Sequence, residues 1–172
     1  EGLGEADNLA ASAPLALTVR TIPSTGGSFS GALTPGARSA YYAITVAAGQ
    51  SLLLNLAGHS TNGVPALYVG AGAVPTTQQF DQRAPGSGLN LQAALSNPSA
   101  NDQTYYVLVF GDQINGSLPF DVSGQVGPLF ITGLTPARLG NLYPATLTLT
   151  GAGFDATTTV DFIRTNGAVF PS

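Results

Sequence analysis

Glycine and proline recur every few residues along this chain, and the apolar residues between them alternate with a period of two. The 172 residues include 22 Gly and 12 Pro, and the apolar positions do not follow the 3.6-residue period of a buried helix face. Short alternating runs bounded by turn residues are typical of β-strands with one face buried. The chain is therefore predicted to be all-β.

Turn residues separate the strand-like runs. AAGQ at 47–50, TPGA at 34–37 and DQINGS at 112–117 supply Gly, Pro or Asn for tight reversals, and Asn115-Gly116 fits a type I′ turn. TTQQFDQ at 76–82 is the single candidate helical turn, although it has no apolar period. The predicted strands cover residues 15–22, 27–33, 40–47, 51–58, 65–70, 89–95, 104–111, 118–126, 128–134, 145–151 and 158–164.

The strand spacing divides the chain into two units. After a leading segment at 1–14, the strands within 15–126 recur as they do in a β-sandwich. A second unit begins near Gly127, but residues 127–172 are fewer than half of the roughly 100 that an immunoglobulin-like sandwich needs. We expect an incomplete second sandwich, either because the chain was cut inside it or because another segment supplies the missing strands.

Composition excludes several classes of function. Only 8% of residues are charged and the net charge is −4, so there is no basic stripe for nucleic acid. The absence of Cys excludes disulfides and thiolate chemistry. No apolar run reaches the roughly 18 residues of a membrane span, so we expect no membrane insertion. Because the chain starts at Glu1 without a signal-like segment, we expect a soluble piece of a processed or longer protein.

The order of motifs from Glu5 to Val126 resembles the bacterial pre-peptidase C-terminal domain. The matching segments are EADNLAASAPL at 5–15, FSGAL at 29–33, YYAITVAAGQSLLLNLAG at 41–58, ALYV at 66–69 and TYYVLVFG at 104–111, followed by GSLPFDVSG. The resemblance implies a jelly-roll-like β-sandwich of the kind appended to secreted proteases and repeated in large bacterial surface proteins. It implies a secreted or cell-surface location.

Residues 130–163 resemble the opening of an IPT/TIG domain, which is an immunoglobulin-like β-sandwich. ITGLTPARLG at 131–140 and ATLTLTGAGF at 145–154 carry this likeness. A sandwich of the first type followed by one of the second is the layout of a long extracellular array, whose modules hold, space or bind. The resemblance implies that the chain is not an enzyme.

The candidate catalytic residues do not form a recognisable pattern. His59 is the sole imidazole and follows a strand in a Gly- and Asn-containing loop, and no G-x-S-x-G motif occurs. Asp102 and Asp112 flank the 104–111 strand, where Asp ordinarily caps a turn. GAGFDA at 151–156 fits a dinucleotide motif, but a strand follows it, so no helix N-terminus is available for a pyrophosphate.

The sequence contains one candidate calcium site and one candidate glycosylation site. The resemblance implies a calcium site in the leading segment, with Glu5, Asp7 and Asn8 as ligands and Glu1 close by. Acidic residues common elsewhere in the family are replaced here by Ser39, Ala40 and the Val64-Pro65-Ala66 stretch. Asn115-Gly116-Ser117 is a candidate glycosylation sequon.

Adjacent tyrosines in two strands raise the question of a binding surface. Neighbouring strand residues point to opposite faces, so Tyr42, Ile44 and Val46 are predicted core and Tyr41 is predicted outward. TYYVLVFG repeats the pattern, and Tyr41, Tyr105 and Tyr68 are candidates for an exposed aromatic strip that contacts sugars or extended polypeptides. Relatives in collagen-degrading enzymes hold collagen with surface tyrosines. The alternative is that each ring packs under a loop or a neighbouring module.

Two functions follow from these features. The first is a non-catalytic structural module of a large bacterial surface, matrix or filament protein, in which sandwiches are joined at residues 125–128 and self-associate. Open strand edges at ITGL or TTVDFIR are then completed by a neighbouring chain. The second is a binding accessory module of a secreted hydrolase, which adheres to a polysaccharide or a fibrous protein.

Overall fold

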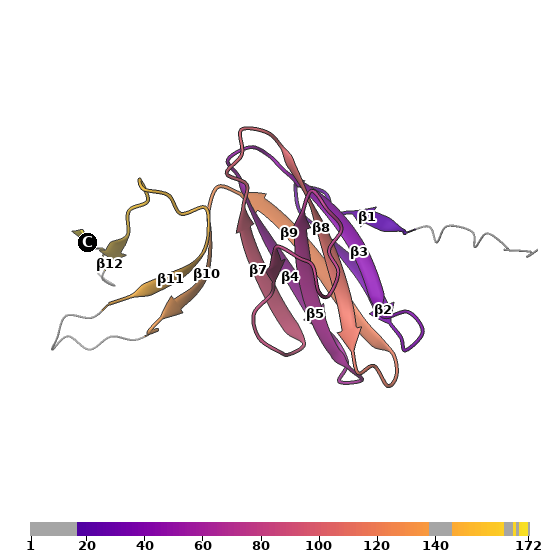
Figure 1. Ribbon diagram of the computed structural model, residues 1–172. Coiled ribbons are helices and arrows are strands. Elements are labelled where there is room, and N and C mark those ends of the chain that lie inside the picture. Colours follow the sequence, from indigo (N-terminus) through magenta and orange to yellow (C-terminus); the bar gives the residue numbers. More distant parts are fainter. Residues whose placement is uncertain (1–16, 138–145, 164–166, 168, 172) are drawn as a thin grey trace, which may run out of the picture.

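The chain folds as an all-β protein with its main body in a two-sheet sandwich (Figure 1). The computed structural model describes residues 17–137, 146–163, 167 and 169–171, and these contain strands and no helix. No segment in the described ranges is a helix long and apolar enough to cross a membrane. The predicted all-β sandwich is confirmed.

Two mainly antiparallel sheets form the sandwich. The first has the strand order β1-β3-β8-β5-β6 and the second the order β2-β9-β4-β7. β1 runs parallel to β3, and the other neighbours are antiparallel. The strands are β1 (Val19–Thr21), β2 (Gly27–Leu33), β3 (Ser39–Val46), β4 (Ser51–Gly58), β5 (Val64–Ala71), β6 (Gln82–Arg83), β7 (Asn90–Ser96), β8 (Gln103–Asp112) and β9 (Leu118–Gly127).

The hydrophobic core lies between the two sheets. Alternating residues of β4 are fully buried at Leu52, Leu54 and Leu56, as the period-two pattern requires. Tyr42 of β3 is also fully buried and meets Phe120 of β9 edge-on, with 6.5 Å between ring centroids. The prediction that Tyr42, Ile44 and Val46 face the core is confirmed.

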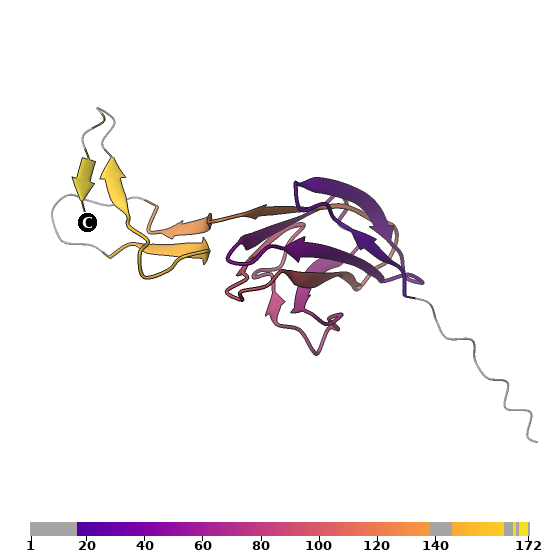
Figure 2. The same ribbon diagram turned by 90° about the horizontal axis from the view of Figure 1, so that it is seen from above.

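A smaller unit of two hairpins continues from the end of the sandwich (Figures 1 and 2). β10 (Phe130–Thr135) pairs with β11 (Thr148–Ala152), and β12 (Asp161–Ile163) pairs with β13 (Val169–Pro171), both antiparallel. We call residues 128–171 the hairpin unit. β9 ends at Gly127, where the second unit was predicted to begin.

Local predictions were wrong where the chain turns. Neither Asn115 nor Gly116 has a positive φ, so the predicted type I′ turn is absent. The left-handed residue of this connection is Gln113, with φ 49°. Residues 76–81 form a loop rather than a helical turn, and the Thr76 hydroxyl accepts hydrogen bonds from the main-chain N–H groups of Gln78 and Gln79. β6 and β13 were not predicted.

Candidate functional site

An aromatic surface lies on the outer face of the β3-β8-β5 sheet. Tyr41 of β3 pairs with Leu108 of β8, which pairs with Tyr68 of β5, which in turn pairs with Arg83 of β6. Paired residues project from the same side of a sheet, so these side chains form one row across the face. Phe110 lies in the adjoining row, where it pairs with Ser39 and Ala66.

The centre of this surface is packed, whereas its margins are open. Leu108, Ala66 and Tyr68 form a small buried cluster, with Tyr41 and Phe110 partly buried beside it. The ring of Phe80, from the loop before β6, lies 5.0 Å from the ring of Tyr68 between centroids and is itself exposed. A ligand would therefore meet the edges of Tyr41, Phe80 and Phe110 before reaching Tyr68.

Two arginines stack on the rings of this surface. The guanidinium carbon of Arg38 lies 5.0 Å from the centre of the Phe110 ring, and that of Arg83 lies 5.6 Å from the centre of the Tyr68 ring. Both distances are within the range of cation–π attraction. We call the set formed by Tyr41, Tyr68, Phe80, Phe110, Arg38 and Arg83 the aromatic–arginine face.

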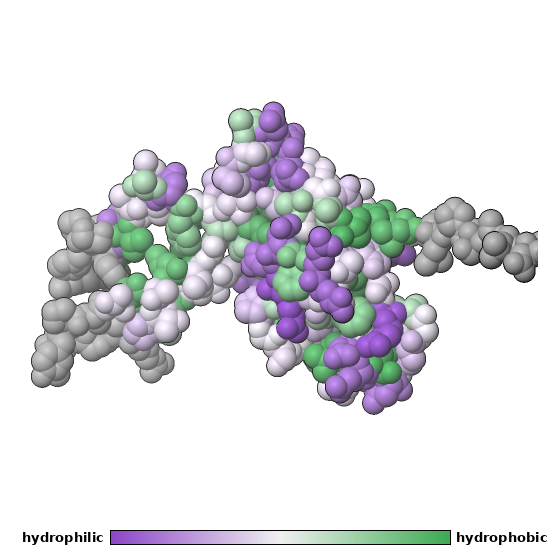
Figure 3. All heavy atoms as spheres, in the orientation of Figure 1, coloured by the Kyte–Doolittle hydropathy of each residue, from purple (hydrophilic) through white to green (hydrophobic). Residues whose placement is uncertain are grey.

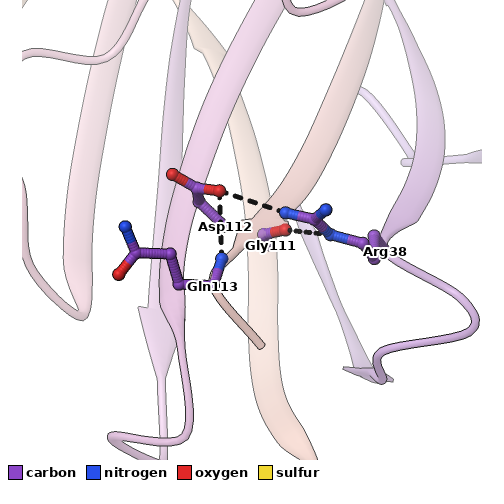
Figure 4. A network of polar contacts seen from close by, with 4 residues as sticks. All are labelled: Arg38, Gly111, Asp112 and Gln113. Carbon is purple, nitrogen blue, oxygen red and sulfur yellow. Dashed lines mark hydrogen bonds and ion pairs between the residues drawn. The ribbon is translucent and has the colours of Figure 1, made fainter. Parts of the chain in front are cut away.

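Hydrogen bonds to Gly111 and Asp112 hold the Arg38 side chain in place (Figure 4). Its Nε donates to the Gly111 carbonyl over 3.0 Å, and its Nη2 donates to Asp112 Oδ1 over 3.0 Å. The same carboxylate oxygen accepts a bond from the Gln113 main-chain N–H over 3.0 Å. Asp112 thus orients a cation at the end of β8.

Asp102 and Asp112 cannot act as a pair. They lie at opposite ends of the ten-residue strand β8, which at about 3.3 Å per residue separates them by roughly 30 Å. Two glycosidase carboxyl groups must lie within about 10 Å of each other. Asp102 accepts a hydrogen bond from the Ala48 N–H over 3.2 Å, which is the turn-capping use expected from the sequence.

Tyr105 does not belong to the aromatic–arginine face, so the predicted strip was wrong at this residue. It pairs with Ile44 of the core face, is 4% exposed, and donates a hydrogen bond from its hydroxyl to the Ser96 carbonyl over 2.9 Å. Burial raises the pKa of the Tyr105 hydroxyl. Its neighbour Tyr106 points outward instead, beside Ala43 and Gly70.

Tyr41 is partly buried and Tyr68 is 8% exposed, so Tyr68 also contributes little open surface.

His59 takes part in a polar cluster that lacks the order of a catalytic triad. Its Nε2 lies 2.7 Å from Asp121 Oδ2, while the Ser30 hydroxyl donates to Asp121 Oδ1 over 2.5 Å. The Asp121 carboxylate stands between the hydroxyl and the imidazole, so the imidazole is not beside Ser30 as a triad requires. Hydrogen bonds from Ser30 and His59 lower the pKa of Asp121.

The remaining predicted sites gain no support as ligand sites. Glu1, Glu5, Asp7 and Asn8 lie outside the described residues, and the calcium site stays a prediction; no group of three His, Asp or Glu within the described ranges could hold a metal ion. Asn115 is exposed, and its glycosylation also stays a prediction. The 151–156 segment forms the end of β11 and a turn in which Asp155 accepts a bond from the Thr157 N–H over 2.9 Å.

The sequence reasoning missed the arginines and phenylalanines of the aromatic–arginine face. Arg38, Arg83, Phe80 and Phe110 are far apart in the chain, and only the pairing of β3, β8, β5 and β6 brings them together. One signal was available for Phe110. It lies two residues after Leu108 in β8, and residues two apart in a strand share a face. The positions of Arg38 and Arg83 carried no comparable pattern.

Comparison with known proteins places this architecture in a family. The two-sheet sandwich defines the class of protein as a β-sandwich module. The family model of the bacterial pre-peptidase C-terminal domain matches residues 38–111. This part of the chain is a pre-peptidase C-terminal domain.

A solved structure of a domain from this family has the same fold. The pre-peptidase C-terminal domain of a collagenase from Bacillus anthracis is 16% identical, with a TM-score of 0.51 over 64% of this chain and 97% of that chain. PliG from Aeromonas hydrophila, a periplasmic inhibitor of g-type lysozyme, is 19% identical, with a TM-score of 0.44 over 63% of this chain and 96% of that chain. No curated protein matches the chain.

The family assignment sets the broad functional class. A pre-peptidase C-terminal domain is a non-catalytic accessory domain, and such domains occur in secreted bacterial proteins. The likeness to the collagenase domain shows the fold alone at 16% identity.

Proposed function

We propose that this chain is a non-catalytic extracellular module that holds the next domain of a large bacterial surface, matrix or filament protein at a fixed spacing. The observation that carries this proposal is the direct passage from the sandwich into the hairpin unit. β9 ends at Gly127 and β10 starts at Phe130, so only Pro128 and Leu129 separate the two strands. So short a connection, with proline in it, leaves little freedom to bend.

Hydrogen bonds across the junction support this proposal. The Gly153 main-chain N–H donates to the Ser96 hydroxyl oxygen over 2.7 Å, which joins the turn after β11 to the end of β7. The buried Ser51 hydroxyl lies 3.3 Å from the Ser96 hydroxyl and 3.4 Å from the Pro128 carbonyl. Gly153 has a φ of 91°, and a Cβ atom there would collide with the Pro128 carbonyl oxygen. The hairpin unit is thus bonded to the sandwich through Gly153 as well as through the connecting chain.

A distance measurement between spin labels tests the fixed spacing. The chain has no Cys, so Ser87→Cys on the sandwich and Ala156→Cys on the hairpin unit provide two unique labelling sites. We expect a narrow distance distribution that broadens in Ser96→Ala and Gly153→Val but not in the control Ser123→Ala, which lies on the polar outer face of β9. A broad distribution in the parent double-cysteine protein would show that the junction is a flexible hinge.

The assembly part of the proposal rests on the exposed apolar side chains of the hairpin unit. Ile131 is 58%, Leu134 45% and Ile163 70% exposed, and Figure 3 shows apolar side chains at the surface of this unit. Two two-stranded sheets also leave strand edges unpaired among the described residues. Added strands satisfy such edges, and we propose that a neighbouring copy of the chain supplies them to the hairpin unit.

Sedimentation velocity over rising protein concentration tests this assembly. We expect the wild-type chain to self-associate and Ile131→Lys to stay monomeric, because a charge would then be buried in the apolar contact. Val64→Lys is the control, since Val64 is similarly exposed but lies on the sandwich. A wild-type chain that stays monomeric at high concentration would refute completion by a second copy.

A second candidate function is favoured by the aromatic–arginine face. Fixed aromatic rings and guanidinium groups on a flat sheet suit binding of polysaccharide or a fibrous protein, so the chain would serve as the binding accessory of a secreted hydrolase. Retention on insoluble polysaccharides and on collagen tests it. Tyr41→Ala and Phe80→Ala should release the protein, whereas Tyr105→Phe should not. Absence of retention on every matrix would discard this function.

A further inference from the structure

The open side of the sandwich, between edge strands β1 and β2, holds a pocket of about 220 Å³. β1 is the edge of one sheet and β2 the edge of the other, and no strand among the described residues closes the gap between the two sheets here. Apolar groups of Leu33 and Phe120 line the pocket, together with Tyr42. The hydroxyl-bearing residues Thr18 and Ser39 lie at its rim and are exposed.

An arginine points into this pocket from the core side of its strand. Arg20 pairs with Tyr42 in the parallel β1–β3 ladder, and paired residues share a face. Tyr42 is a core residue, so Arg20 projects toward the interior at the margin of the sheet. The side chain of Arg20 is exposed at this margin, so its guanidinium is accessible to a ligand in the pocket.

The described residues provide no carboxylate for Arg20. The lining of the pocket contains no acidic side chain, and the ion pairs in the described part of the chain are Arg38–Asp112 and His59–Asp121. The pocket therefore combines a positive charge, hydroxyl groups and an apolar wall. Such a combination matches an anionic group that is attached to an apolar one.

Tyr42 supplies a positioned hydrogen-bond donor. Its ring is packed against Phe29 and Phe120, which fixes the direction of its hydroxyl. Burial raises the pKa of Tyr42, and the nearby Arg20 guanidinium opposes this in part. The phenol is therefore protonated at neutral pH and can donate to an anion beside Arg20.

We propose that this pocket binds the carboxylate at the C-terminal end of a polypeptide. Arg20 would take the two carboxylate oxygens with its planar fork of N–H donors, the Tyr42 hydroxyl would donate to one of them, and the terminal side chain would lie against Leu33 and Phe120. The volume is smaller than the 300 Å³ or more of ordinary small-molecule sites, which favours a single terminal residue over a sugar chain. Binding of a terminal carboxylate is a known mode of peptide recognition.

An inward-pointing charge on an edge strand has another established use, which is to prevent sheets from pairing edge to edge. This alternative predicts a different result for the same substitution. If Arg20 is only a guard against edge pairing, Arg20→Gln will promote self-association without affecting any ligand. If it binds a carboxylate, Arg20→Gln will weaken peptide binding.

Titration of the ¹⁵N-labelled protein with trialanine tests the proposal. We expect saturable shifts of the amide signals of Thr18, Arg20, Gly31 and Ser39, and no saturable shift with trialanine amide, which lacks the carboxylate. Affinity should fall at least tenfold in Arg20→Gln, severalfold in Arg20→Lys, and severalfold in Tyr42→Phe, which keeps the core ring. Thr21→Val is the control, because Thr21 follows Arg20 in β1, is exposed and does not line the pocket, and the affinity of this variant should be unchanged.

Two further probes distinguish the source of the carboxylate. N-acetyl-aspartate amide presents a side-chain carboxylate, and digalacturonic acid presents a sugar carboxylate; both should bind more weakly than trialanine. Tighter binding of digalacturonic acid, equal binding of trialanine and its amide, or an Arg20→Gln protein that dimerises and keeps its peptide affinity would each overturn the proposal.

Discussion

The side-chain amide of Asn97 donates a hydrogen bond to the main-chain oxygen of Val46 over 3.0 Å. Asn97 follows β7 of one sheet, whereas Val46 ends β3 of the other, so this bond ties the two layers together at one end of the sandwich. The same amide group donates to the Asn101 carbonyl over 2.9 Å, and its oxygen accepts from the Ser99 N–H over 3.1 Å. Asn97 is only 2% exposed.

Replacement of Asn97 should cost much of the stability of the sandwich. Asn97→Ala removes several hydrogen bonds and leaves buried carbonyl groups without donors, so we expect a loss of about 2–4 kcal/mol in the free energy of unfolding, measured with urea. Asn55→Ala is the control, because Asn55 makes one bond, from Gln92 Nε2 over 2.8 Å, on the outer face. It should cost about 1 kcal/mol or less. Equal losses of unfolding free energy in the two variants would contradict the role of Asn97 as a link between the two sheets.

The adjacent tyrosines of β8 should respond differently to loss of the hydroxyl. Tyr105→Phe removes the bond to the Ser96 carbonyl and should lower the free energy of unfolding by about 1 kcal/mol. Tyr106→Phe should have little effect, since Tyr106 lies on the outer face. Chemical denaturation of both variants measures the difference. A greater loss in Tyr106→Phe would reverse the assignment of faces.

Gly70 should not tolerate a side chain. A Cβ atom at Gly70 would collide with the carbonyl oxygen of Ala73, and backbone there cannot move aside as a flexible side chain can. We expect Gly70→Ala to destabilise the protein by about 1–3 kcal/mol. Gly36→Ala is the matched control, because nothing lies within 4 Å of the added atom and φ is not positive. Thermal unfolding measures the difference between the two variants. Equal unfolding midpoints would refute this expectation.

The Asp121 carboxylate should make stability depend on pH in the acidic range. Hydrogen bonds from Ser30 and His59 lower its pKa below the ordinary 3.8, so folding favours the ionised form. This contribution is present above the unfolded pKa and is lost as pH falls through the lower folded pKa. The melting temperature of wild type should therefore exceed that of Asp121→Asn at about pH 6. The difference should shrink below pH 3.8. A difference that grows on acidification would have the wrong sign.

Most strands could be predicted because local pattern decides them. The segments at 27–33 and 51–58 were predicted with the bounds that β2 and β4 have, since clear alternation and Gly or Pro at both ends leave one solution. β6 was missed because two residues cannot show a period. The turn at Asn115-Gly116 was misjudged because Gln113 takes the left-handed conformation instead.

The aromatic–arginine face could be predicted only in part. Tyr41 was placed correctly on the face opposite Tyr42. The strand is apolar on one face and partly polar on the other, and this difference shows which face meets the core. Tyr105 was misplaced because both faces of β8 are apolar: Leu108 is as buried as Val107 and Val109. Alternation then shows which residues share a face, but not which face meets the core.

The amino-acid sequence by itself determined the class of fold and the core face of β3, because these depend on periodicity and turn chemistry within short segments. Only the tertiary structure decided the orientation of β8 and the pocket beside Arg20. The register that pairs Tyr42 with Val107 turns Tyr105 inward, and the parallel pairing of Arg20 with Tyr42 turns a cation toward the core margin. Both depend on contacts between strands distant in the chain, which no local pattern encodes.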